Sequence, residues 1–131
     1  MTPGQIAREL WARVAAHDWP GVRALLDDDV VLDYPHTGER FVGADAVVQL
    51  NADYPDGWSI SLVDVVSEGD RAVCEVEVPM EGVGIFAVAS VLTVRDGLVA
   101  RIREYWIQQV GDDPPAYRAH LAERYDGRVT S

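Results

Sequence analysis

Three segments with a two-residue hydrophobic period decide the fold: AVCEVEVPM at 72–80, IFAVASVLTV at 85–94 and VARIREYWIQ at 99–108. In the first of them, Val76 and Val78 alternate with glutamates, so one side meets apolar material and the other meets water or a partner. Glu-Gly and Asp-Gly pairs stand between the segments as turns. With a fourth segment at 58–66, the pattern predicts four antiparallel strands covered on one side.

The N-terminal half of the chain has helical spacing instead. Helices are predicted at 3–17, from Trp19 to the acids at 27–29, and at 44–54, with Asp18 as a cap of the second. A short hairpin, 30–34 and 40–42, separates the second helix from the third. Helices that precede an antiparallel meander predict an α+β domain with its helices on one face of the sheet.

Length and composition predict one domain, 1–131, with 111–131 as a C-terminal extension. Cys74 is the single cysteine, so no internal disulfide is expected and a reducing, cytoplasmic location is predicted. The net charge of −11 argues against nucleic acid and anionic membranes as partners. No window approaches the length of a membrane span, and the start has no signal-peptide pattern.

Three anchors together resemble the nuclear transport factor 2-like superfamily: DVVLDYP at 29–35 with GADAV at 43–47, and DG at 96–97 leading to REYW at 103–106. This superfamily includes SnoaL-like polyketide cyclases, scytalone dehydratase, limonene epoxide hydrolase and bacterial ketosteroid isomerases. The resemblance implies a cone-shaped, curved antiparallel sheet that encloses one pocket with three helices from the N-terminal half. It also implies pairing of two copies through the sheet.

Against the ketosteroid isomerases, the resemblance puts Asp33 at the position of the general base. The phenolic donor of that family falls on Val14 and its protonated carboxylic acid falls on Ser90. Because an enolate needs preorganised donors at its oxygen, the loss of both argues against a standard steroid isomerase.

The same alignment turns Glu104 into the pocket and makes it, with Asp33, a candidate catalytic pair. Two carboxylates in one apolar site raise the pKa of at least one of them, which provides an acid and a base. Two alternatives stay open: Glu104 pairs with a neighbouring arginine or points outward, and Asp33 caps the turn at Thr37 and Gly38.

A wider set of residues is predicted to line the pocket: Trp11, Val14, His36, Tyr54, Trp58, Val78, Ser90, Ile102 and Trp106. His36 either orients a carboxylate or is a solvated loop residue. The histidines show no paired ligand spacing, so no metal site is predicted. The absence of a phosphate-binding glycine loop or a Cys-x-x-Cys pair predicts chemistry without a cofactor.

Two functional hypotheses follow. One is a cofactor-free acid/base enzyme of isomerase, cyclase, dehydratase or epoxide hydrolase type, acting on a small, mostly apolar, oxygenated molecule. The other is a non-catalytic ligand-binding or dimerisation module, which is favoured if large side chains such as Trp58 and Trp106 fill the cavity. Opposite charges lie on nearby strands, Glu75 and Glu77 against Arg101 and Arg103, and pair either between two subunits or within one sheet. A homodimer is the prediction.

Overall fold

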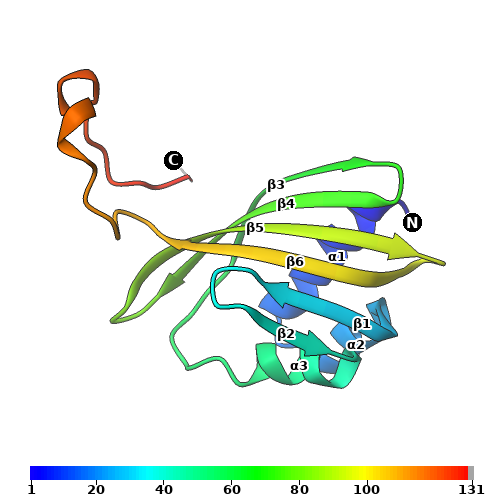
Figure 1. Ribbon diagram of the computed structural model, residues 1–131. Coiled ribbons are helices and arrows are strands. Elements are labelled where there is room, and N and C mark those ends of the chain that lie inside the picture. The colour runs from blue at the N-terminus through cyan, green and yellow to red at the C-terminus, as the bar shows by residue number, and fades with distance from the viewer. Residues whose placement is uncertain (130–131) are drawn as a thin grey trace.

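The computed structural model describes residues 1–129 and consists of helices followed by a sheet and a tail (Figure 1). The helices are α1 (Pro3–Ala15), α2 (Trp19–Leu25) and α3 (Ala44–Ala52), with a 3-10 helix η1 (Ala116–Leu121) in the tail. The strands are β1 (Leu26–Tyr34), β2 (Glu39–Val42), β3 (Ser61–Glu68), β4 (Arg71–Met80), β5 (Gly84–Arg95) and β6 (Leu98–Gln108). The predicted α+β class is confirmed.

All six strands form one sheet in the order β2-β1-β6-β5-β4-β3. Every pairing is antiparallel except that of β1 with β6, which is parallel. This crossover was not predicted, because the two strands are distant in sequence and each alone is compatible with either direction. It places the first strand of the chain beside the last.

Several predicted boundaries were wrong by a few residues. The segment at 58–66 enters the sheet only at Ser61, and Trp58 contributes an isolated bridge to Met80. The acids at 27–29 belong to the start of β1 rather than to the end of a helix. Helices α1 and α3 end at Ala15 and Ala52, two residues before their predicted ends.

The three helices cover one face of the sheet, and the core lies between them (Figure 1). We call this covered side the inner face. Burial alternates along β4 as the sequence predicts, with Ala72, Cys74, Val76 and Val78 buried beneath α1. The opposite, outer face carries no helix, and its side chains are largely exposed.

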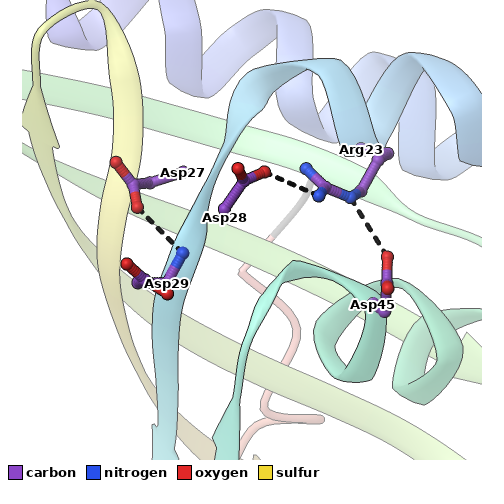
Figure 2. A network of polar contacts seen from close by, with 5 residues as sticks. All are labelled: Arg23, Asp27, Asp28, Asp29 and Asp45. Carbon is purple, nitrogen blue, oxygen red and sulfur yellow. Dashed lines mark hydrogen bonds and ion pairs between the residues drawn. The ribbon is translucent and has the colours of Figure 1, made fainter.

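Arg23 near the end of α2 ties three elements together (Figure 2). Its Nη2 donates to Asp28 of β1 at 2.7 Å and its Nε donates to Asp45 of α3 at 3.1 Å. Asp27 accepts a hydrogen bond from the backbone N–H of Asp29 at 2.9 Å. The acids at 27–29 therefore help to hold α2, β1 and α3 together. Residues 1–129 contain no group of three His, Cys, Asp or Glu side chains that could hold a metal ion.

Beyond β6 the chain leaves the sheet and returns toward it through η1 (Figure 1). Residues 111–126 are all exposed. Within the described part of the chain, no helix is long and apolar enough to cross a membrane.

The N-terminal cap of α2 generates a prediction. Asp18 Oδ1 accepts from the N–H of Gly21 at 3.0 Å, and a Cβ at Gly21 would lie 2.1 Å from Asp18 Oδ2. Gly21→Ala should therefore displace the cap, at a cost of about 1 kcal/mol, while gaining a similar amount of helix propensity. In an Asp18→Ala background the cap is already lost and the close neighbour that remains is the flexible Arg13 side chain, with its Cδ at 3.0 Å, so the same substitution should then stabilise. Urea unfolding of the four proteins measures this coupling, and equal effects in both backgrounds would contradict it.

Candidate functional site

The space between the helices and the inner face is divided into two small compartments. The inner compartment lies among α1, α2, α3, β1 and β6, and the outer one lies toward the segment between α3 and β3. Each has a cavity volume of about 20 Å³. That is room for water but not for an organic ligand, which occupies several hundred cubic ångströms. The interior is therefore nearly filled by side chains.

Three residues line both compartments: Trp11 of α1, Asn51 of α3 and Glu104 of β6. Asn51 is held by its own helix, since its Nδ2 donates to the Val47 carbonyl at 2.8 Å. The indole N–H of Trp11 is buried and makes no hydrogen bond of ordinary geometry within residues 1–129. It faces the buried Cys74 thiol, whose pKa burial raises to about 11 and this donor lowers in part. Trp11 is therefore a weakly satisfied donor on this wall.

Glu104 is the acidic group of this wall, and only 6% of it is exposed. Ser90 Oγ donates to Oε2 at 3.1 Å, and Trp106 Nε1 donates to Oε1 at 3.3 Å. Burial raises the pKa of Glu104, and these two donors offset part of that rise. No cation of the described chain pairs with it, because Arg40 and Arg101 lie on the outer face. The alignment with the ketosteroid isomerases predicted this inward orientation correctly, and the alternatives of an arginine partner or an outward side chain were wrong.

Asp33 does not share the cavity with Glu104, so the predicted placement of this pair was wrong. In β1 the buried positions are Leu32 and Tyr34, and Asp33 between them faces outward, paired in register with Arg40 and Arg103. Arg40 donates to both carboxylate oxygens, at 2.7 and 3.1 Å, and Arg101 donates to Oδ2 at 3.2 Å.

The hydrogen bond from Arg40 holds the pKa of Asp33 below its usual range, with the charge of Arg101 adding to the effect. A carboxylate held in this way is a poor proton acceptor. The predicted hydrogen bond of Asp33 to the turn at 37–38 is also not formed, since that turn is closed by backbone bonds to the Tyr34 carbonyl.

Tyr34 takes the inward place that the alignment assigned to Asp33. Its hydroxyl lies 2.9 Å from that of Tyr54, at the end of α3, and either can be the donor. Burial raises the pKa of both phenols, and the nearby Glu104 charge raises them further. Both hydroxyls therefore remain neutral donors. The alternation Val30, Leu32, Tyr34 in the sequence is the signal that could have identified Tyr34.

Aromatic rings close the outer compartment. Tyr54 stacks on Trp106 with ring centroids 5.8 Å apart, and Trp58 lies 6.0 Å from Tyr54. The ring of His17, a residue with a positive φ of 56°, lies between those of Trp19 and Trp58 at 5.4 and 4.9 Å. We call these four residues, Trp19, Tyr54, Trp58 and His17, the rim; Tyr54 and Trp58 line the outer compartment.

The remaining predicted pocket residues divide between the compartments. Val14 and Ile102 line the inner one, and Trp58, Val78 and Trp106 line the outer one. Ser90 lies behind Glu104 as its donor, and exposed His36 packs its ring 5.2 Å from that of Tyr34 outside both compartments. Asn51 was missed, because a polar residue in a helix gives no sign of the face it occupies.

Comparison with protein families gives one match. Residues 7–102 match the model of the SnoaL-like domain. A search of curated protein sequences finds no match to this chain.

Solved structures with the same fold include proteins of different assigned activity. A candidate ketosteroid isomerase from Kribbella flavida DSM 17836 is 29% identical, with a TM-score of 0.87 over 94% of this chain and 89% of its own. A nuclear transport factor 2-like protein of unknown function from Burkholderia xenovorans LB400 is 22% identical, with a TM-score of 0.73 over 92% and 93%. An LEH-like epoxide hydrolase from M. tuberculosis is 18% identical, with a TM-score of 0.68 over 80% and 82%. These likenesses support the nuclear transport factor 2-like fold.

The burial of Glu104 predicts a pH-dependent cost. A carboxyl whose pKa is raised in the folded state keeps its proton while the unfolded chain ionises, so stability falls as pH rises above about 4.3. Glu104→Gln removes this loss. Its free energy of unfolding relative to wild type should increase with pH, by at most about 1.4 kcal/mol per pH unit, until the folded acid also ionises. Denaturant unfolding from pH 4 to 8 measures it, with exposed Glu75→Gln as control, and parallel curves would contradict it.

Asp33 predicts the opposite pH dependence. Its lowered pKa contributes stability that is present above the unfolded value of about 3.9 and is lost as pH falls through the folded value. Asp33→Asn should therefore be less stable than wild type at neutral pH, and the difference should shrink in acid and in 1 M salt. Thermal unfolding of both proteins at pH 7 and at pH 2 tests this expectation. A difference that persists at pH 2 would show that the amide disturbs packing instead.

Proposed function

The chain belongs to the SnoaL-like domain family of the nuclear transport factor 2-like superfamily, and we propose that its interior binds a small, mostly apolar, oxygenated molecule and transfers a proton to or from it. Glu104 is the proposed acid/base group, and the chemistry is of isomerase, cyclase, dehydratase or epoxide hydrolase type without a cofactor. The observation that carries this proposal is a buried carboxyl, without a cationic partner in residues 1–129, at the junction of two apolar compartments.

The hydrogen bonds of Glu104 suggest which oxygen holds the proton. The indole of Trp106 can only donate, so Oε1 must accept. In the neutral acid the proton then belongs on Oε2, where the Ser90 hydroxyl can rotate from donor to acceptor. A carbonyl, epoxide or hydroxyl oxygen near Oε2 could receive this proton, and Ser90 would stabilise the carboxylate that remains.

Other polar groups of the interior can orient the same ligand. The N–H of Trp11, which has only the weak acceptor Cys74 beside it, could be a second donor to a ligand oxygen. The neutral hydroxyl pair of Tyr34 and Tyr54 supports a third polar point, near the rim. An apolar cavity with a few convergent donors is the usual form of a small-molecule site.

The size of the cavity favours a second candidate. Compartments of about 20 Å³ do not admit an organic substrate without movement of side chains. A non-catalytic module with a packed interior is consistent with this volume. Acid/base catalysis requires that the rim opens, and Trp58 is the larger of the two rim side chains that line the same compartment as Glu104.

The proposal predicts linked binding and proton transfer. Some cyclic ketones, epoxides or tertiary alcohols should bind the protein and raise its Tm. The Trp58→Ala variant should bind a larger set of these compounds than wild type does. For any compound that wild type converts, Glu104→Gln should keep binding and lower turnover by about 10² to 10⁴-fold. Thermal shift identifies ligands, and NMR of the mixture detects conversion.

Glu75→Gln is the matched control, because it makes the same change on the exposed outer face of the sheet. Conversion that survives in Glu104→Gln at the wild-type rate would remove Glu104 from the mechanism. Binding without conversion by wild type or Trp58→Ala would favour the non-catalytic module.

A further inference from the structure

His17 has a backbone conformation that is unusual for its residue type. It follows α1, and its φ of 56° lies in the left-handed region. Its N–H donates to the Val14 carbonyl at 3.0 Å, and the N–H of Asp18 donates to the Arg13 carbonyl at 2.9 Å. This pair of bonds is a Schellman motif, in which glycine is the usual residue at the position of His17. The turn therefore carries backbone strain, and strain of this kind is concentrated at functional sites.

The side chain of His17 makes contacts that glycine could not make. Its ring stacks on Trp19 with an interplanar angle of 21° and on Trp58 with an angle of 25°. Trp19 begins α2, whereas Trp58 lies in the segment between α3 and β3, so the imidazole joins two parts of the chain that are distant in sequence. None of the ion pairs in the described residues includes His17, so stacking holds this ring.

Trp58 lies between the outer compartment and solvent. Its side chain lines the compartment together with Glu104, yet it is only half-buried. The backbone of Trp58 is fixed by its bridge to Met80. Rotation of the indole is therefore the simplest movement that opens the compartment, and this rotation has to break the stack on His17.

We propose that His17 is a specificity-determining residue of the interior site, because its ring holds Trp58 against the outer compartment and so limits which molecules reach Glu104. This inference rests on the proposed function, since it assigns a gate to the same site. His17 is a positioning residue: it lines neither compartment and acts through Trp58.

The gate has a thermodynamic consequence. A ligand that requires an open rim binds with an affinity lowered by the fraction of molecules in which the rim is open. Removing the ring of His17 raises this fraction. Every ligand too large for the closed compartments should then bind more tightly, whereas removal of a histidine elsewhere should have no such effect.

Hydrogen exchange of the Trp106 indole N–H tests the gate without a ligand. This group donates to Glu104 inside the outer compartment, so water has to enter before it exchanges. The backbone N–H of Val88, a buried residue of β5 between β4 and β6, reports unfolding of the sheet instead. NMR measures both rates in one sample, and their ratio separates opening of the rim from loss of stability.

His17→Gly removes the ring and provides the residue that the left-handed turn prefers, so the protein should still fold. The rate of Trp106 relative to Val88 should increase at least tenfold. His17→Phe keeps an aromatic ring and should stay within about threefold of wild type. His120→Gly, the same substitution at an exposed residue of η1, is the matched control and should change nothing. An unchanged ratio in His17→Gly, or equal acceleration of both groups, overturns the gate.

Ligand access separates this inference from the proposed function. Cyclohexanone and cyclohexene oxide are the probes, and thermal shift of each variant at one fixed concentration detects binding. A probe that binds Trp58→Ala but not wild type should also bind His17→Gly, and it should not bind His17→Phe. A probe that binds Trp58→Ala but not His17→Gly overturns the gate and leaves the proposed function intact. Faster Trp106 exchange in His17→Gly, with no binding of either probe to any variant, supports the gate and counts against the proposed function.

Discussion

The alternation of side chains along a sheet that is covered on one face is the constraint on which the other features of this molecule depend. Because side chains alternate along β6, Ile102 and Glu104 lie in the interior, and Arg101 and Arg103 lie on the outer face. The parallel pairing of β1 with β6 extends the same division to Tyr34 and Asp33. The interior chemistry and the outer charges are therefore two sides of one strand pattern. A shift of one residue would exchange them, which is why the register must be strongly specified by burial.

The same constraint explains how much the sequence could predict. The meander was predicted because its three segments alternate clearly and are separated by turn residues, and the alignment with the family, which set the parity of these strands, correctly turned Glu104 inward. Asp33 was misplaced because its position came from a loose anchor at 29–35, in which a slip of one residue is not penalised. The apolar alternation of Val30 and Leu32 in that strand favours Tyr34 as the inward side chain. Local periodicity was here the better guide than the resemblance.

Other features were out of reach of sequence patterns for physical reasons. The parallel contact of β1 with β6 depends on which strand edges meet, and this is decided by the whole topology. The volume left inside the domain depends on how Trp11, Trp58 and Trp106 pack together, and residue size alone does not give it. The burial of Glu77 was hidden because an alternating strand predicts an exposed glutamate there, and only the return of the tail covers it.

The two buried glutamates show why charge compensation matters for function. Glu77 on the outer face is fully buried but has Arg128, Gln109 and a backbone N–H as donors, so its burial is compatible with the ionised form and serves to hold the tail. Glu104 has only two neutral donors and no cation in the described part of the chain, so its burial raises its pKa and favours the protonated form. A group that keeps a proton because ionisation is costly can donate that proton once a ligand provides new stabilisation of the anion. The largely apolar interior strengthens this proton transfer, because electrostatic interactions in a low dielectric are larger than in water.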